Sequence, residues 1–142
     1  MIRTSTRNAY PCRVTAVTEG AVHTLVQMEL AGGQPLCAAL TLTSAAEMGL
    51  APGTEVLALV KASFVILAAG TLPGPVSARN VLTGTVAARR DGAVYSEIVL
   101  DIGGGQTVTA TITIDSADRL GLAAGDTATA LFKAGHVILA LP

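Results

Sequence analysis

The segment LVKASFVILA at residues 59–68 returns as LFKAGHVILA at residues 131–140, and each copy holds one of the chain's two lysines, Lys61 and Lys133. The same offset relates Ser-x-Arg-Asn at residues 5–8 to a second copy at residues 77–80. Residues 5–69 align with 77–141 without a gap, and 27 of the 65 pairs are identical. The chain is therefore a tandem duplication. We expect a first unit at 1–70, a Pro- and Gly-rich linker at 71–76 and a second unit at 77–142.

Each unit has the pattern of a small β-structure. Alternate residues over 22–30 are apolar or small, which predicts a strand with one buried face: Val22, Thr24, Val26, Met28 and Leu30. The glycine-rich segments AGGQ (31–34) and GGGQ (103–106) predict hairpin turns. Two further strands are expected in residues 54–62 and 64–68, separated by a tight turn.

One short helix is expected between the strands of each unit. Ser44 and Glu47 form a possible capping box in the first unit, and Asp115 is a possible N-cap in the second. Gly49 and Gly121 fit the position just after each helix. Five short strands and one helix in about 65 residues predict an all-β fold of two tandem OB-like five-stranded barrels. A unit this small buries little surface, so we expect association between the halves and into a homo-oligomer.

Composition restricts the functions that the chain can serve. The net charge is −1, 13% of residues are charged and 3% are aromatic, which argues against a nucleic-acid partner. No apolar run is long enough to span a membrane without a Gly or Pro interruption, and the first residues lack the apolar core of a secretory signal. We therefore expect a cytoplasmic protein. Cys12 and Cys37 are expected to be buried free thiols, with a disulfide as the alternative.

The polar residues that the duplication preserves are mostly hydrogen-bond donors. They are Ser5, Arg7, Asn8, Thr41, Ser44 and Lys61 with Ala62 in the first unit, and Ser77, Arg79, Asn80, Thr113, Ser116 and Lys133 with Ala134 in the second. No histidine and no identical carboxylate is shared, so the common set lacks a general base, a nucleophile–base pair and a metal cage. Donors without a base indicate a receptor for a small oxyanion rather than an enzyme.

Structural roles for the same residues remain open. The arginines are possible surface residues that cap carbonyl groups, the lysines possible charges at a sheet edge, and the asparagines possible turn residues. The serines are useful at helix starts in any case, and the threonines are ordinary strand residues. His23 and His136 each lack a counterpart in the other unit, so we expect no functional role for them.

The combination of motifs resembles a known family. SARN, ITIDSADRLGL and LFKAGHVILAL in the second unit, with STRN, LTLTSAAEMGL and LVKASFVILAA in the first, are similar to the molybdate-binding Mop module. Both units match, so the whole chain resembles a two-module (di-Mop) molbindin of the TOBE/Mop type. The resemblance implies binding of molybdate, and of tungstate, for intracellular storage or homeostasis. It implies no further cofactor, and it implies a homotrimer that brings six modules together.

The resemblance also implies where the anion binds. One kind of site lies between modules and joins the Ser-x-Arg-Asn segment of one to the Thr, Ser and Lys-Ala positions of its neighbour. These residues are Ser5, Thr6, Arg7 and Asn8 or Ser77, Ala78, Arg79 and Asn80, facing Thr41, Ser44, Lys61, Ala62 and Ser63 or Thr113, Ser116, Lys133 and Ala134. A second kind lies near the threefold axis and is built from backbone at Gly20, Ala21, Val22, Gly92, Ala93 and Val94.

The two units differ inside the implied sites. Thr6 corresponds to Ala78, Ser63 to Gly135, and Cys12 to Gly84, so the halves are expected to differ in affinity. Two other functions remain as alternatives. One is a molybdate-responsive regulatory or transport-accessory module that acts through a protein partner. The other, disfavoured by the missing base and aromatic residues, is an enzyme or an OB-type nucleic-acid binder.

Overall fold

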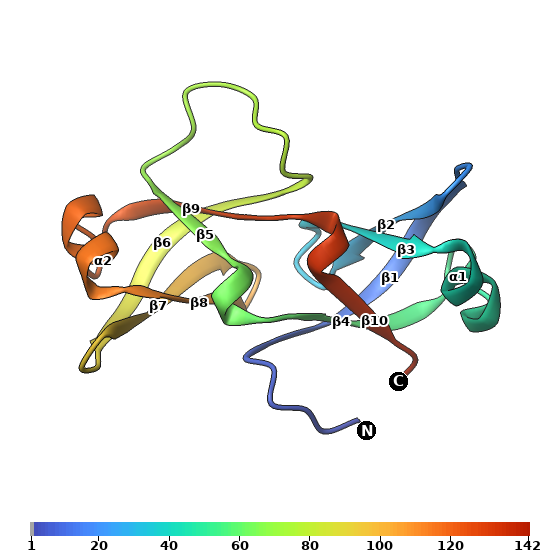
Figure 1. The fold of residues 1–142 in the computed structure, drawn as a ribbon, viewed down its shortest axis with the longest axis horizontal. Helices are drawn as coiled ribbons and strands as arrows, with labels where there is room; N and C mark the ends of the chain where they lie inside the picture. The colour runs from blue at the N-terminus through green and yellow to red at the C-terminus, as the bar shows by residue number, and fades with distance from the viewer. Residues whose placement is uncertain (1) are drawn as a thin grey trace.

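The computed structural model describes residues 2–142 and consists mainly of strands (Figure 1). The first half contains β1 (Asn8–Glu19), β2 (His23–Leu30), β3 (Pro35–Thr41), α1 (Leu42–Met48), β4 (Glu55–Val60), the 3₁₀ turn η1 (Ala62–Phe64) and β5 (Ile66–Ala69). The second half contains β6 (Asn80–Asp91), β7 (Tyr95–Gly103), β8 (Gln106–Thr113), α2 (Ile114–Leu120), β9 (Thr127–Phe132), η2 (Ala134–His136) and β10 (Val137–Ala140). The predicted all-β fold, with two similar units and one short helix in each, is confirmed.

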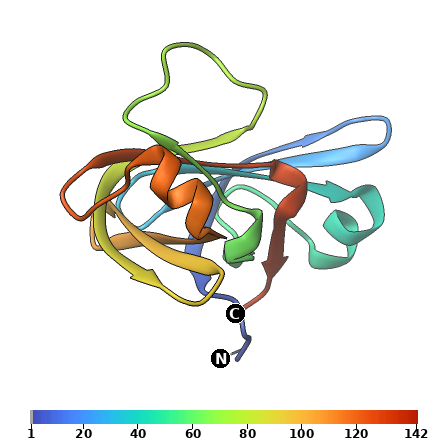
Figure 2. The same ribbon diagram turned by 60° about the vertical axis from the view of Figure 1, so that its left-hand side comes forward.

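The two sheets exchange their last strands. The strand order is β10-β4-β1-β2-β3 in the first sheet and β5-β9-β6-β7-β8 in the second. Ile138 of β10 pairs with Leu59 of β4, and Ile66 of β5 pairs with Leu131 of β9. In Figures 1 and 2 the red β10 accordingly lies beside β4, while the green β5 crosses to β9. Each curled sheet thus takes four strands from one repeat and its fifth from the other.

Alternation along β2 produces the buried face that the sequence predicted. Thr24, Val26, Met28 and Leu30 are buried, and the residues between them are exposed or half-buried. Val22 is the exception, because it precedes β2 in a turn and is 71% exposed. The buried apolar residues of both halves form one continuous cluster, in which Val26 of the first sheet and Ile98 of the second are both fully enclosed. The two sheets therefore share one hydrophobic core.

Each helix begins directly after a strand, at a threonine. Thr41 has an extended backbone, and its Oγ1 accepts a hydrogen bond of 3.1 Å from the backbone N–H of Ser44. Thr113 does the same for the N–H of Ser116, also at 3.1 Å. Such a bond satisfies one of the free N–H groups of the first helical turn.

The predicted capping residues are therefore wrong at the N-terminal ends. Ser44 and Glu47 lie inside α1, and Asp115 lies inside α2, because the preceding threonine already supplies the capping oxygen. At the other ends the prediction holds. Gly49 and Gly121 adopt the left-handed conformation, with φ of 61° and 64°, which glycine enters without steric cost.

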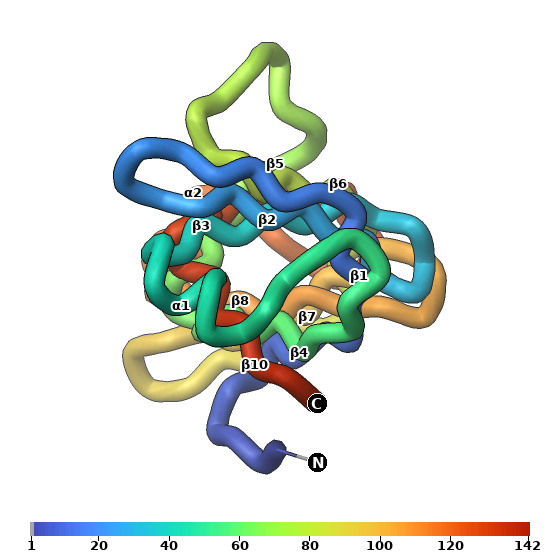
Figure 3. Tube along the Cα trace, turned by 90° about the vertical axis from the view of Figure 1, so that its right-hand side faces the viewer, coloured from blue at the N-terminus to red at the C-terminus, as the bar shows by residue number. Residues whose placement is uncertain are grey.

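The hairpin turns of the two repeats meet. A Cβ atom added to Gly104 would lie 2.6 Å from Cα of Gly32, so this contact requires glycine. Beside it, Nε2 of Gln34 donates to the carbonyl oxygens of Ile102 and Gly103 at 3.1 and 2.9 Å. Viewed along the long axis, the cyan and orange hairpins run next to each other (Figure 3). This contact and the strand exchange together join the two repeats into one folded unit.

Cys12 and Cys37 are free and buried, which confirms the prediction of buried free thiols. Burial raises the pKa of the Cys12 thiol to about 12. Burial also raises the pKa of Cys37, against the opposing effect of the nearby Arg79 guanidinium. Across residues 2–142, none of the helices has the length and apolar character needed to cross a membrane.

Candidate functional site

Strand register brings together the two cationic motifs that each repeat contains, the Ser-x-Arg-Asn segment and the Lys-Ala segment. Asn8, the first residue of β1, pairs with Val60, the last residue of β4. Arg7 and Lys61 are the next residues outward, so both lie off the same end of this strand pair. Asn80 pairs with Phe132 in the second repeat and places Arg79 and Lys133 in the same relation. An antiparallel ladder therefore joins segments that are more than 50 residues apart in the sequence.

A cleft of about 390 Å³ forms where Arg7 and Lys61 meet, and we call it the Arg7 cleft. It is open to solvent. Its lining combines cationic and hydroxyl side chains with apolar ones: Ser5, Thr6, Arg7, Leu59, Lys61, Ala62, Ser63, Phe64, Thr111, His136 and Ile138. Six of the predicted first-unit residues, Ser5, Thr6, Arg7, Lys61, Ala62 and Ser63, thus share one space.

The threonine–serine pairs at the helix starts lie apart from the lysine of their own repeat. Because β5 joins the opposite sheet, η1 crosses and packs against β8, while η2 packs against β3. A second cleft of about 550 Å³ is lined by Ser63 of the first repeat together with Thr113 and Ser116 of the second. We call it the α2 cleft.

Within one chain, the structure brings segments of different repeats together near the helix starts. The resemblance implies that Thr41 and Ser44 act with Lys61, and Thr113 and Ser116 with Lys133, and this grouping stays a prediction. In the structure the segment after Lys61 faces the start of α2, and η2, which follows Lys133, faces the strand that leads to Thr41. The strand exchange is the reason, since it carries each Lys-Ala segment over the other sheet.

Hydroxyl groups at the helix starts are already ordered by one another. Thr41 Oγ1 donates to Ser44 Oγ at 2.9 Å, and Thr113 Oγ1 donates to Ser116 Oγ at 2.9 Å. Each serine accepts this bond and so keeps its own hydroxyl proton for another partner. In the second repeat, Arg119 also donates to Ser116 Oγ at 3.2 Å. The Ser116 hydroxyl is thus available as a donor at the edge of the α2 cleft.

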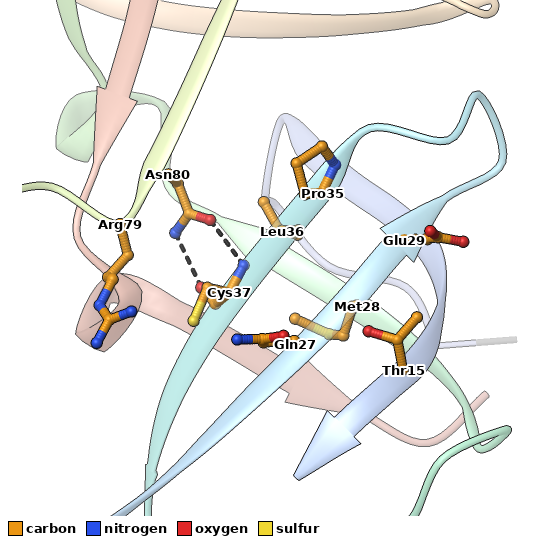
Figure 4. A pocket seen from close by; sticks show the side chains of 9 residues that line it. All are labelled: Thr15, Gln27, Met28, Glu29, Pro35, Leu36, Cys37, Arg79 and Asn80. Atoms are coloured by element: carbon orange, nitrogen blue, oxygen red, sulfur yellow. Dashed lines mark hydrogen bonds between the residues drawn. The ribbon is translucent and has the colours of Figure 1, made fainter. Parts of the chain in front are cut away.

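Asn8 and Asn80 hold the two sheets together through their amides. The Asn8 amide donates to the carbonyl oxygens of Val60 and Thr109 at 3.1 and 2.8 Å, and its Oδ1 accepts from the Thr109 N–H at 2.7 Å. Asn80 makes the equivalent pair of bonds to the backbone of Cys37, at 2.7 and 2.9 Å (Figure 4). Both N–H groups of Asn8 are thereby used, so it positions Arg7 and has no donor left for an anion.

Arg79 borders a different cleft, of about 380 Å³, which we call the Arg79 cleft. Asn80, Cys37 and Gln27 are among its lining residues, and Figure 4 shows the guanidinium of Arg79 directed away from the carboxylate of Glu29. Lys133 is not part of this lining. Ser77 and Ala78 precede Arg79 in the segment between β5 and β6. This yellow-green segment projects from the body at the top of Figures 1 and 2.

The cations of the Arg7 cleft have different partners. Arg7 makes a two-pronged ion pair with Glu97, with Nη1–Oε2 at 2.7 Å and Nη2–Oε1 at 3.0 Å. Lys61 Nζ lies 5.6 Å from the centre of the Phe64 ring, within the range of a cation–π contact. Phe64 in turn stacks on His136 at 4.4 Å, and Nδ1 of that histidine is buried without a hydrogen-bond partner.

The predicted axial positions occupy the turns between β1 and β2 and between β6 and β7. Gly20 N–H donates to the carbonyl of His23 at 2.9 Å, and Gly92 N–H donates to that of Tyr95 at 2.7 Å. Ala21 and Ala93 are exposed, and the side chains of Val22 and Val94 are 71% and 62% exposed. Anion binding at these turns stays a prediction.

Six residues at the Arg7 cleft were missed at the level of sequence: Leu59, Phe64, Thr111, His136 and Ile138 of its lining, and Glu97, which bonds to Arg7. Glu97 and Thr111 reach the cleft because the second sheet packs on the first, and His136 and Ile138 reach it because β10 pairs with β4. Glu97 had a detectable signal, because the equivalent residue of the first repeat is the apolar Leu25. No cluster of three or more His, Cys, Asp or Glu side chains suited to a metal ion occurs in the described part of the chain.

Comparison with known proteins identifies the domain that each repeat forms. A family profile for the TOBE domain matches twice, at residues 4–67 and 76–139. The molybdenum-pterin-binding protein MopA of Rhodobacter capsulatus is 61% identical over 141 residues, which are 99% of this chain and 53% of that protein. MopB of the same organism is 54% identical and is covered to 52%. The chain thus spans about half the length of the curated relatives it matches.

One solved structure matches over its full length. It is the cytoplasmic molybdate-binding protein ModG with molybdate bound, at 42% sequence identity and a TM-score of 0.95. The match covers 99% of this chain and 100% of that one. The tandem arrangement of two modules is therefore shared in full with a protein that has been observed with molybdate.

Proposed function

The chain belongs to the TOBE-domain family, as a tandem two-module Mop protein, and from this premise we propose that it binds molybdate. The observation that supports the proposal most directly is the Arg7 cleft, where register and strand exchange collect a guanidinium, an ammonium group and several hydroxyls. Such a set offers hydrogen-bond donors and positive charge, which suits a tetrahedral dianion.

Each group has a role toward the anion in this proposal. Arg7 and Arg79 supply a planar fork for two oxygens, and Lys61 and Lys133 supply a point charge. Ser5, Ser44, Ser63, Ser77 and Ser116 supply hydroxyl donors, with backbone N–H groups at Ala62, Ala78 and Ala134. A dianion removed from water requires this many partners, because its desolvation costs several kcal/mol. The protein binds and releases the anion without transforming it.

A homotrimer with sites shared between modules is the assembly we propose. In one chain the clefts are open, Ser116 lies in a different cleft from Arg7, and Ser44 lines neither cleft. A neighbouring chain would close these clefts and supply the missing donors. Exposed apolar side chains, including Ile66 at 62% and Ile138 at 64%, support association. We propose storage or buffering of molybdate in the cytoplasm, with tungstate as a second ligand.

A regulatory or transport-accessory role is the second candidate. The curated relatives are about twice as long as this chain, which favours a module whose anion occupancy is sensed by another protein segment. The two candidates share the same binding chemistry. They differ in whether a protein partner binds the loaded form more tightly than the free form.

Titration calorimetry with molybdate, tungstate, sulfate and single-stranded DNA tests the proposal. We expect tight binding of the first two anions, weak binding of sulfate and none of DNA. Light scattering should show a trimer at micromolar concentration. Arg79→Lys should weaken molybdate binding nearly as much as Arg79→Ala, since both remove the fork. Normal molybdate binding by Arg79→Lys would contradict the proposed role of this residue. Absence of molybdate binding by the wild-type protein would refute the proposed function.

A further inference from the structure

The fork of Arg7 is already occupied by a carboxylate of the same chain. Both terminal nitrogens of Arg7 bond to Glu97, at 2.7 and 3.0 Å, in the two-pronged geometry that guanidinium groups adopt with pairs of oxygen atoms. The Arg7 side chain is 56% exposed and that of Glu97 is 24% exposed. Glu97 is thus the more enclosed partner, fixed on β7 between Arg90 and Thr111 in the strand register.

The second repeat has no such arrangement. Leu25 stands in the first repeat where Glu97 stands in the second, so the residue related to Glu97 by the duplication offers no carboxylate to Arg79. Within residues 2–142, no carboxylate oxygen lies within 4.0 Å of the Arg79 side-chain nitrogens. The two arginines are therefore equivalent in sequence but different in state: one is paired and the other is free to receive an anion.

An oxyanion and the Glu97 carboxylate compete for the same two N–H groups of Arg7. A carboxylate and a tetrahedral oxyanion each present a pair of oxygens that can accept from both N–H groups of the fork. Glu97 also carries a negative charge beside the position that the dianion would take, and like charges at close range oppose binding. Glu97 leaves Nε and the outer N–H groups of Arg7 free, but an anion that takes the two-pronged position must displace Glu97. Binding at Arg79 requires no such exchange.

We propose that Glu97 sets the affinity of the Arg7 cleft by acting as an internal competitor of the bound oxyanion. This inference rests on the proposed molybdate-binding function and adds a difference between its two classes of inter-module site. The Arg79 class fills first, and the Arg7 class fills at higher concentration. A buffering protein with two affinities responds over a wider range of free anion than one with a single affinity.

Two substitutions, each made in a protein that already lacks one of the two arginines, test the inference. Arg79→Ala isolates the Arg7 class of sites, and Arg7→Ala isolates the Arg79 class. In the Arg79→Ala protein, Glu97→Gln removes the charge at nearly constant shape and should tighten molybdate binding by about tenfold, on the scale of a close charge pair at a partly exposed site. In the Arg7→Ala protein, Leu25→Glu introduces the competitor and should weaken binding by a similar factor. Titration calorimetry gives both constants.

The controls separate this inference from the proposed function. Glu97→Gln in the Arg7→Ala background should change nothing, because the competitor then has no arginine to occupy. Thermal melts without ligand establish that every variant is folded. Weaker binding after Glu97→Gln would show that Glu97 orients Arg7 for the anion, and unchanged binding would show that the pair is incidental; either result overturns the inference. Absence of molybdate binding in the wild type overturns both proposals.

Discussion

Replacing Asn8 with alanine is expected to lower the free energy of unfolding by about 2–5 kcal/mol, although Asn8 contributes little apolar surface. Asn8 is buried at the start of β1, and its amide bonds the N–H and the carbonyl of Thr109 at 2.7 and 2.8 Å. Thr109 lies on β8, the edge strand of the other sheet, and is itself buried. The Asn8 amide thus forms with the Thr109 backbone the two hydrogen bonds that a neighbouring strand would otherwise form.

The size of the expected stability loss follows from the polar groups that the substitution leaves without a hydrogen-bond partner. The Asn8→Ala variant leaves a buried N–H and a buried carbonyl on Thr109 without this partner, and it removes a further bond of 3.1 Å to the carbonyl of Val60. A buried polar group without a partner costs about 1–3 kcal/mol. Water that enters the space would recover part of this loss. Such a loss is a large fraction of the total stability, which is about 5–15 kcal/mol for a typical domain.

Urea unfolding, followed by circular dichroism on the full chain, measures the effect. Thr85→Ala, an exposed position on β6, is the matched control and should change stability by about 0.5 kcal/mol or less. Asn8→Asp keeps the acceptor for Thr109 but loses both donors and buries a charge, so it should be at least as damaging as Asn8→Ala. A loss below 1 kcal/mol for Asn8→Ala, with an unchanged denaturant slope, would refute the idea that this amide bridges the sheets.

Three further outcomes follow from other parts of the molecule. Lys133→Ala should weaken one class of molybdate sites by about 10- to 100-fold in calorimetry. The unliganded melting temperature should be no lower than that of the wild type, because Lys133 is exposed and its side chain forms no ion pair within residues 2–142. An unchanged number of tight sites would contradict its role. Arg89, and then Ser96, hold the pKa of Asp91 below its ordinary value of 3.8, so their stabilisation is complete above about pH 4 and is lost as the pH falls. Acid titration of unfolding should therefore show Asp91→Asn less stable than the wild type at pH 7, with the difference narrowing as the pH falls below 3.8. A constant difference at all pH values would argue against this linkage. Cys12, whose pKa burial raises to about 12, should resist iodoacetamide at pH 8 in the native protein and react once unfolded, as followed by mass spectrometry; rapid native labelling would contradict its burial.

The sequence predicted the strands and their buried faces because both depend on local alternation. Thr24, Val26, Met28 and Leu30 recur with the period of a strand, and their burial needs no knowledge of the partner strand. The N-caps were misplaced because Thr41 and Ser44 are both capable of capping. Only the strand that ends at Thr41 fixes which of them holds the extended backbone.

The strand exchange was beyond the reach of the sequence for a physical reason. Val-Ile-Leu-Ala occurs identically at residues 65–68 and 137–140, so the composition of β5 and β10 carries no information about which sheet each one completes. The duplication did single out Arg7 and Lys61 as site residues. Glu97 and Thr111 lie near them because the second sheet packs on the first, and His136 does so because β10 pairs with β4.

Because of the strand exchange, two strands that pair with each other are synthesised at different times. β4 is complete at Val60, yet the strand that covers its open side, β10, begins only at Val137. At about 5–20 residues per second on the ribosome, this side of β4 stays uncovered for roughly 4–15 s. An uncovered strand edge pairs readily with other chains, and a neighbouring nascent copy carries the same Val-Ile-Leu-Ala segment. Ribosomes spaced closely on one message would therefore favour interlocked chains, whereas slow initiation would leave each chain to complete its own first sheet.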